Sequence, residues 1–289
     1  MDIGQDIKGF LMTRRARITP EQVGLPPGRR RRVPGLRREE VAQLAGVSIE
    51  YYTQIERGHV AGVSEEVLDA VAAALRLSDV ERTHLFDLAR AGAVKPGRRR
   101  TARRTAANLP DGVQELLDSM VGAPAVVLNG HLDVVAANAL GRALYAPAFG
   151  RSAAPPNLAR SVFLDPSAAA VFPDWAAAAD DVVALLRVEA ARVPDSPEVF
   201  ALVGELATRS EPFRTRWAAH NVKAHHHGAK RFRHPAVGEL TLTYNAFELP
   251  GAAGLSLIGY TAAPQSPAEQ ALKLLASWLA TEQPGIVVE

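Results

Sequence analysis

The stretch VAQLAGVSIEYYTQIERG, residues 41–58, constrains the fold of this chain more than any other part of the sequence. Its first half predicts a short helix with one apolar stripe, made of Val41, Leu44 and Ala45. Gly46 follows where helices commonly end in a left-handed residue. Ser48 is a good N-cap for a second helix, whose inner face carries Tyr52 and Ile55. Two short helices around a glycine turn indicate a helix-turn-helix.

Three further helices are expected around this pair. The first runs from about Gln5 to Ala16, and its apolar spacing is set by Ile7, Phe10, Leu11 and Arg14. Ser64 caps another helix, with an inner face made of Val67, Leu68, Val71 and Leu75. Ser78 and Glu81 form a capping box for the last helix, which buries Leu85 and Leu88. We therefore predict a five-helix domain over residues 1–92.

At this point the sequence resembles the XRE (Cro/phage-repressor-like) family of DNA-binding domains. The matching residues are Val41, Ala42, Leu44, Ala45, Gly46, Val47, Ser48, Ile55, Glu56, Arg57 and Gly58. The resemblance implies that the second helix of the pair enters the major groove of double-stranded DNA. A helical hairpin without DNA is the simpler alternative.

In that geometry, the outward side chains of the first two turns meet base edges. The expected reading face consists of Ser48, Ile49, Glu50, Tyr51, Thr53 and Gln54. Gln54 is suited to adenine, Glu50 to a cytosine amine and Ile49 to a thymine methyl group. Glu50 also suits a first helical turn without DNA, because a carboxylate there favours the helix dipole. Tyr51 has the alternative of packing on the domain surface.

Basic residues are concentrated in the N-terminal third. Residues 1–107 hold 20 Lys and Arg against 13 Asp and Glu, whereas residues 108–289 hold 13 against 18. Such an asymmetry suggests a module that binds a polyanion. Arg37, Arg38 and Arg57 flank the expected pair of helices and are placed for phosphates. Arg29, Arg30, Arg31 and Arg32 lie in a Pro- and Gly-rich loop, and we expect an arm that contacts DNA or else a solvated loop.

Residues 93–108 combine Pro, Gly and five arginines without apolar periodicity, which predicts an exposed linker. This linker either tracks phosphates or serves as a solvated hinge. The chain has no cysteine, no apolar run of membrane-spanning length and no signal-like N-terminus. We expect a cytoplasmic protein that does not contact membranes.

Residues 109–289 show a mixed pattern. Around Asn129-Gly130 the sequence reads as a strand, a turn and a strand, and residues 238–249 alternate between apolar and polar side chains. A further strand is expected within 254–263. Helices are expected after the hairpin, through the alanine-rich region 166–222 with breaks near Pro194 and Pro197, and over 266–280, where Leu272, Leu275 and Leu279 are apolar. We predict an α+β domain with an antiparallel sheet of about five strands.

This half resembles the MmyB-like ligand-binding domain, a PAS-like fold that follows an XRE domain in transcriptional regulators. The resemblance lies in VVAANALGRALY, WAAHNV, GAKRFRHPAVGELTLTYNAFELPG and YTAAPQSPAEQALKLLASW. It implies an apolar pocket for a fatty-acid-like molecule and no cofactor. The candidate lining residues are Phe163, Phe172, Trp175, Trp217, His220, Tyr244, Phe247 and Tyr260. Each of them is also compatible with a plain core.

The histidines of KAHHHGAK suggest a metal, but on a strand only His225 and His227 share a face. We therefore predict no metal site. The sequence lacks the phosphate-loop, nucleophile-elbow and zinc-hydrolase motifs, so we expect no enzyme. The leading hypothesis is a homodimeric regulator that binds a pseudo-palindromic operator and responds to a ligand. The alternative is a regulator whose C-terminal domain serves only dimerisation or protein-partner sensing.

Overall fold

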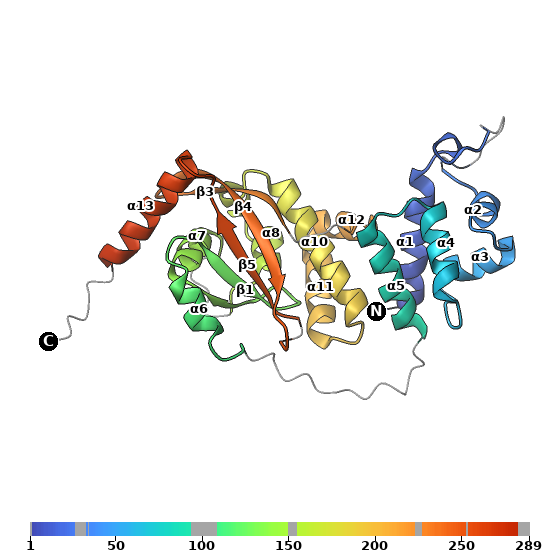
Figure 1. Cartoon of the computed structure of the whole chain (residues 1–289), viewed down its shortest axis with the longest axis horizontal. Coiled ribbons are helices and arrows are strands. Elements are labelled where there is room, and N and C mark those ends of the chain that lie inside the picture. The colour runs from blue at the N-terminus through green and yellow to red at the C-terminus, as the bar shows by residue number, and fades with distance from the viewer. Residues whose placement is uncertain are drawn as a thin grey trace. The chain divides into compact units, whose positions relative to one another are not determined.

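The computed structural model describes residues 2–26, 33, 35–93, 109–149, 155–222, 227–252 and 254–282. Its contacts divide the chain into two compact units (Figure 1). The first unit comprises Met1–Ala102, Arg187–Phe200 and Arg214–Lys223. The second unit comprises Arg103–Leu186, Ala201–Phe213 and Ala224–Glu289. The domain bounds 1–92, 93–108 and 109–289 remain a sequence prediction, and 94–108 lies outside the described residues.

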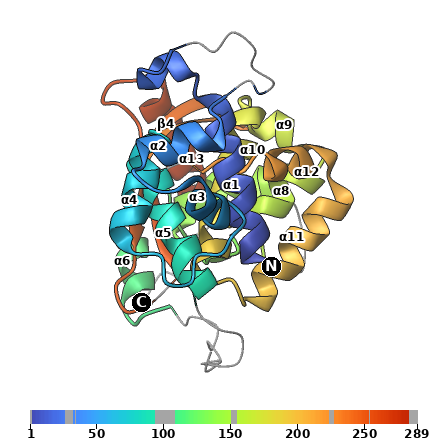
Figure 2. The same cartoon turned by 90° about the vertical axis from the view of Figure 1, so that its right-hand side faces the viewer.

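Five α-helices form the N-terminal part of the first unit, as the sequence predicts. They are α1 (Ile3–Arg17), α2 (Arg38–Leu44), α3 (Ile49–Glu56), α4 (Glu65–Ala74) and α5 (Asp79–Ala93). Ser48 and Ser64 cap α3 and α4, because their hydroxyl groups accept hydrogen bonds from the amides of Tyr51 and Val67. Ser78 and Glu81 make the predicted capping box of α5. Figure 2 shows α3 facing the viewer among the other helices of this part.

One apolar core joins these helices. Its fully buried side chains include Ile7, Phe10, Leu11, Val41, Tyr52, Ile55, Val71 and Leu85. The expected stripe of α2 is only partly correct. Val41 and Ala45 are buried, but Leu44 is 37% exposed because it lines a surface groove rather than the core.

The segment between α1 and α2 is not entirely loop, although the sequence predicts one. Pro20–Val23 forms a short 3-10 helix (η1), which is preceded by the N-cap residue Thr19 and followed by Gly24, whose φ of 76° is left-handed. Gln22 explains this helix, because its side chain accepts a hydrogen bond from the Thr19 amide in a capping box. Residues 27–32, including Arg29 to Arg32, lie outside the described residues.

An antiparallel sheet organises the second unit. Its strands are β1 (Ala125–Leu128), β2 (Val134–Ala137), β3 (His227–His234), β4 (Gly238–Glu248) and β5 (Ser256–Thr261), in the order β2-β1-β5-β4-β3. The β1–β2 hairpin and the five-stranded sheet confirm the sequence prediction. Along β4, Leu240, Leu242 and Tyr244 are buried, while Thr241 and Thr243 are exposed. The alternation in the sequence thus places one face of β4 in the core.

The remaining helices come from the part of the chain after residue 112. They are α6 (Val113–Ser119), α7 (Ala139–Phe149), α8 (Leu158–Leu164), α9 (Ala168–Val171), α11 (Pro197–Arg209), α12 (Glu211–Ala218) and α13 (Pro267–Glu282). The sequence predicts all of these except α6 and α8. The helix α10 (Trp175–Arg192) has residues in both units, and so do α11 and α12. None of the helices in the described ranges is long and apolar enough to cross a membrane.

A single buried amide ties the hairpin to α7. The Asn138 side-chain oxygen accepts hydrogen bonds from the amides of Ala125, at 3.0 Å, and Gly141, at 2.7 Å. Its side-chain nitrogen donates to the carbonyl oxygens of Met120, at 2.8 Å, and Ala123, at 2.7 Å. All four hydrogen-bonding positions of this buried amide are satisfied, so Asn138 fixes how α7 leaves the sheet.

Candidate functional site

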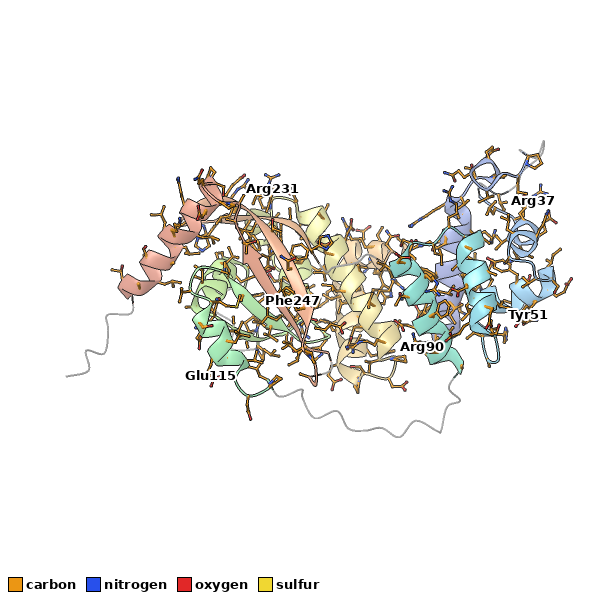
Figure 3. The ribbon with its side chains drawn as sticks, viewed as in Figure 1. Arg37, Tyr51, Arg90, Glu115, Arg231 and Phe247 are labelled. Carbon is orange, nitrogen blue, oxygen red and sulfur yellow. The ribbon has the colours of Figure 1, made fainter. Side chains whose placement is uncertain are left out.

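The helix α3 presents a polar face to solvent. Ser48, Ile49, Glu50, Tyr51 and Gln54 are exposed and Thr53 is half-buried. Tyr52, Ile55 and Glu56 on the opposite face are buried. Tyr51 points outward at the edge of the first unit (Figure 3). The structure therefore brings all the predicted reading residues together on one accessible surface.

The turn before α3 depends on a left-handed residue. Gly46 has a φ of 67°, which a side chain would disfavour. Its amide donates to the Gln43 carbonyl at 3.2 Å, and the Val47 amide donates to the Ala42 carbonyl at 3.0 Å. These bonds end α2 and set the angle at which α3 leaves it.

A buried carboxylate fixes α3 against α1 and α2. Glu56 is 1% exposed, and its oxygens accept hydrogen bonds from Arg15 Nε and Arg38 Nε, both at 2.9 Å. Arg15 also donates to the Leu36 carbonyl at 2.7 Å, while the Leu36 amide donates to the Arg15 carbonyl at 3.0 Å. Arg38, predicted to contact phosphates, thus has a structural partner, although 44% of its side chain is exposed.

The other predicted phosphate contacts lie beside α3. Arg57, the residue directly after the end of α3, is exposed. Arg37 precedes α2 and forms an ion pair with Glu39 at 3.0 Å, between side chains that are 42% and 55% exposed. Figure 3 shows that Arg37 and Tyr51 project from the same end of the first unit. Surface pairs of this kind contribute ~1 kcal/mol or less, so the pair with Glu39 adds little to the stability of the domain.

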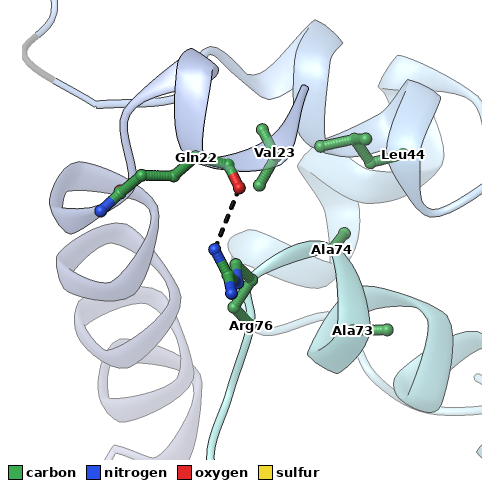
Figure 4. A pocket seen from close by; sticks show the side chains of 6 residues that line it. All are labelled: Gln22, Val23, Leu44, Ala73, Ala74 and Arg76. Carbon is green, nitrogen blue, oxygen red and sulfur yellow. Dashed lines mark hydrogen bonds between the residues drawn. The ribbon is translucent and has the colours of Figure 1, made fainter. Parts of the chain in front are cut away.

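A groove of about 340 Å³ opens between η1, α2 and α4 (Figure 4). Its lining consists of Gln22, Val23, Leu44, Ala73, Ala74 and Arg76. Among the lining residues, Arg76 donates to the Gln22 carbonyl at 3.0 Å. This groove lies on elements other than the reading helix, and the sequence pattern does not predict it.

In the second unit, aromatic rings gather over the buried face of the sheet. Tyr145 on α7 meets Phe232 on β3 edge to face at 5.4 Å between ring centroids, and Phe232 meets Tyr260 in the same way at 5.6 Å. Phe172 lies 5.8 Å from Phe232, and Tyr244 lies 6.4 Å from Tyr260. We call Tyr145, Phe172, Phe232, Tyr244 and Tyr260 the aromatic core.

One cation reaches into the aromatic core. The Nζ atom of Lys230, on β3, lies 4.9 Å from the Phe172 ring centroid and 5.4 Å from that of Phe232. It also donates to the Tyr145 hydroxyl at 3.3 Å. Aromatic faces attract an ammonium group but do not neutralise its charge. Lys230 therefore places a positive charge beside the rings of the aromatic core.

Two tyrosine hydroxyls lie beside this charge. The Tyr145 and Tyr260 hydroxyl oxygens are 2.5 Å apart, within hydrogen-bonding distance. Burial raises the pKa of Tyr260 well above its ordinary value. Burial, with a smaller contribution from the charge of Asp181, raises the pKa of Tyr244 to about 12. Near pH 7 the phenol groups of Tyr244 and Tyr260 are therefore neutral, and each is able to donate a hydrogen bond.

Comparison with known families gives two matches. The description of the first is a helix-turn-helix domain, and it matches residues 14–85. The second is the MmyB-like transcription regulator ligand binding domain, and it matches residues 109–275, more than half of the chain. The chain belongs to this MmyB-like family. None of the curated proteins compared with the chain is significantly similar to it. The two matches together identify a transcription regulator that carries a DNA-binding domain and a ligand-binding domain.

The MmyB-like domain brings only some of the predicted ligand residues together. Phe172, Tyr244 and Tyr260 belong to the aromatic core. Phe163 and Trp175 pack with each other, with 6.0 Å between their ring centroids. Phe247 is 58% exposed, and it pairs with Leu257 on the face of the sheet opposite to Tyr244. The alternation of the strand explains this separation, since 244 and 247 differ by an odd number of positions.

Two predicted ligand residues, Trp217 and His220, belong to the first unit. Sequence reasoning also missed Tyr145, Phe232 and Lys230, which the MmyB-like domain places at the aromatic core. Along β3, exposed residues alternate with Gly228, Lys230 and Phe232. This period of two is the pattern that could have indicated Lys230 and Phe232 as inward-facing residues. Of the histidine run, His225 and His226 lie outside the described residues, whereas His227 begins β3 and is exposed. No group of three potential metal ligands occurs among the residues that the structure describes.

Proposed function

We propose that the helix-turn-helix domain reads a specific DNA sequence with α3, and that an apolar molecule with an acidic head binds the MmyB-like domain and changes DNA affinity. The observation that carries the DNA part is the single exposed face of α3, which holds all the predicted reading side chains. The observation that carries the ligand part is Lys230, whose charge faces three aromatic rings and no carboxylate in the contacts described above.

On DNA, side chains on α3 would contact base edges in the major groove. Gln54 suits adenine, Glu50 suits a cytosine amine and Ile49 suits a thymine methyl group. Arg37 and Arg57 would hold phosphates, which orient the helix without specifying sequence. Arg29 to Arg32 would extend this contact along the backbone or into the minor groove.

Dimerisation is part of this proposal. One α3 helix covers only a few base pairs, so two heads on a pseudo-palindromic operator would supply the required specificity. In the second unit, Leu274 and Trp278 are one helical turn apart on α13 and are 65% and 48% exposed. Two exposed apolar side chains on one face favour a self-association surface. The same observation supports the alternative function, in which the C-terminal domain serves only assembly or a protein partner.

A fatty acid fits the aromatic core by its chemistry. Its chain would lie against the rings, and its carboxylate would pair with Lys230 and accept hydrogen bonds from the neutral tyrosines. A mostly apolar site with a few convergent polar groups is typical of small-molecule sites. Native mass spectrometry of the unheated full chain tests this directly. A copurified carboxylic acid supports the ligand, whereas a ligand-free chain that also fails to bind dodecanoate supports the assembly alternative.

The DNA part is tested by selecting bound duplexes from a random pool. A Thr53→Ala/Gln54→Ala variant should lose the selected sequence preference and keep its salt-sensitive affinity for any duplex. An unchanged footprint on the selected operator would refute the reading face. Replacing Arg29 to Arg32 with alanine should leave the preferred sequence unchanged and lower the salt slope by a few units, roughly 0.9 for each phosphate that is no longer neutralised.

A further inference from the structure

A buried arginine belongs to the same compact unit as the DNA-binding helices. Arg187, on α10, is 2% exposed. Its Nη1 atom lies 3.0 Å from His220 Nδ1 and 3.9 Å from the Asp6 carboxylate on α1. Its guanidinium stacks 4.2 Å above the Trp217 ring on α12 and donates to the Trp217 carbonyl. One cation therefore joins α1 to α10 and α12.

The surface of α1 is complementary to the segment that follows α12. Arg14 on α1 donates to the His220 carbonyl at 2.7 Å, and Arg17 donates to the Asn221 side chain. A Cβ atom at Gly9 would overlap the His220 ring at Nε2. The His220 ring therefore fits where α1 has no side chain, and His220 itself has a left-handed φ of 50°. We call Asp6, Gly9, Arg14, Arg187, Trp217 and His220 the α1 latch.

The charges of the α1 latch are poorly balanced. Burial lowers the pKa of Arg187 to about 10, opposed by the charge of Asp6. Among the described residues, Arg187 Nε has no hydrogen-bond partner, and neither does Asp6 Oδ2. A buried ion pair is stable only when its geometry and hydrogen bonds offset the loss of hydration. At 3.9 Å the Asp6 carboxylate offsets less of the lost hydration of Arg187 than a partner at hydrogen-bonding distance would, so this pair is the weak contact of the latch.

The same helix also reaches the aromatic core. Asp181 precedes Arg187 on α10 by six residues, a rise of about 9 Å along the axis. Asp174, directly before α10, forms an ion pair at 3.2 Å with Arg231 on β3, the residue between Lys230 and Phe232. The charge of Asp181 also contributes to the raised pKa of Tyr244 and of Tyr260. A shift or rotation of α10 that accommodates a ligand at these tyrosines would therefore move Arg187 as well, because a continuous helix moves as a rigid element.

We propose that Arg187 is the coupling residue of this regulator: occupation of the aromatic core moves α10, and the α1 latch converts that movement into altered DNA affinity of the helix-turn-helix. The inference rests on the proposed ligand-responsive function. A ligand changes DNA affinity only through contacts that differ between two states. The latch supplies such contacts on α1, which packs directly against α3 and α5.

The test uses the full chain, a duplex selected from random DNA, and dodecanoate as the probe. The measured quantity is the ratio of DNA dissociation constants with and without dodecanoate. Wild type should show a ratio of about fivefold or more. Arg187→Met should bring the ratio close to one, while calorimetry shows dodecanoate affinity within about twofold of wild type. Arg192→Met is the matched control, because this exposed arginine on the same helix pairs only with Glu189 among the described contacts.

A second variant opens the latch from α1 without touching Arg187. Gly9→Ala would displace the His220 ring, at the end of a rotatable side chain, and should also bring the ratio close to one. Gly204→Ala, on α11 with open space around it, is the control and should keep the wild-type ratio. If Arg187→Met fails to fold, Gly9→Ala still tests the proposal, because alanine favours the helical conformation that Gly9 adopts in α1.

The outcomes separate the two proposals. A wild-type ratio that persists in both latch variants overturns the coupling role of Arg187 and leaves ligand-responsive regulation intact. A ratio of one in wild type overturns the responsive function itself, and the coupling inference with it. Loss of dodecanoate binding in Arg187→Met, or loss of all DNA binding in both latch variants, also overturns the inference, because Arg187 would then hold ligand or merely maintain the fold.

Discussion

The carboxylate of Glu56, the last residue of α3, accepts a hydrogen bond at 2.9 Å from Arg15 Nε on α1, a residue 41 positions earlier. Arg38 binds the same carboxylate from α2, at 2.8 Å from Nη2. Because Glu56 is buried, this triad fixes the orientation of the reading helix on its domain. The position of α3 thus depends on charges that lie on the side of the helix opposite to its exposed face.

Removing Glu56 should therefore destabilise the helix-turn-helix domain. In a Glu56→Ala variant, Arg15, whose side chain is only 12% exposed, loses its counter-charge, and we expect a loss of about 3–5 kcal/mol in the free energy of unfolding. Urea denaturation followed by circular dichroism measures this loss. Glu39→Ala, which removes an exposed partner of Arg37, should cost about 1 kcal/mol or less. Equal losses in the two variants would contradict a special role for the triad.

The turn between α2 and α3 should be sensitive to a single methyl group. Gly46→Ala places a Cβ in open space, so its only cost is the left-handed backbone, about 1 kcal/mol. Gly204→Ala, inside α11, should instead stabilise by up to ~1 kcal/mol because its backbone is helical. Thermal unfolding of both variants checks the opposite signs. A stabilised Gly46→Ala protein would be incompatible with the turn described for α2 and α3.

Lys230 should distinguish an acid from its neutral analogue. Lys230→Met keeps the apolar stem and removes the charge, so dodecanoate affinity should fall by about tenfold or more. The methyl ester of dodecanoate should bind wild type and variant alike. Calorimetry measures both ligands, and Lys273→Met, whose side chain is 70% exposed on α13, is the control. Parallel losses for acid and ester would instead make Lys230 a packing residue.

Lowering the pH should destabilise the first unit, because a buried histidine, His84, becomes protonated. His84 is 3% exposed, neither ring nitrogen has a hydrogen-bond partner among the described residues, and Phe10 packs on its ring at 5.1 Å. Burial, followed by the charges of Arg187, Arg14 and His220, lowers its pKa to about 3. The unfolded chain binds this proton near pH 6.5, so its stabilising contribution is present above that pH and is lost as the pH falls toward 3.

A His84→Phe variant removes that titration while keeping an aromatic ring in place. Its unfolding free energy should fall less steeply with acidification, by up to ~1.4 kcal/mol for each pH unit below about 6.5. Urea titrations at several pH values measure the slopes. His59→Phe, which replaces an exposed histidine, is the control variant. Identical slopes for wild type and His84→Phe would show that other groups control the acid response.

Local patterns were enough to predict most of the helices and strands. The caps at Ser48 and Ser64, the glycine turn at Gly46 and the alternation along β4 each act within a few residues, so they can be recognised in a linear sequence. Leu44 shows the limit of such patterns. An apolar side chain at the end of a helix packs in the core or lines a groove according to elements far away in the chain.

The sequence by itself determined the helix-turn-helix, the exposed face of α3 and the antiparallel sheet, because hydrophobic period, capping and turn chemistry are short-range. Only the tertiary structure decided which aromatic residues meet: Tyr145 and Phe232 join the aromatic core, while Phe247 faces the opposite side of the sheet. It also decided that Trp217 and His220 contact a buried arginine and α1. These contacts join positions far apart in sequence, and their free energy depends on burial and distance, which no local pattern encodes.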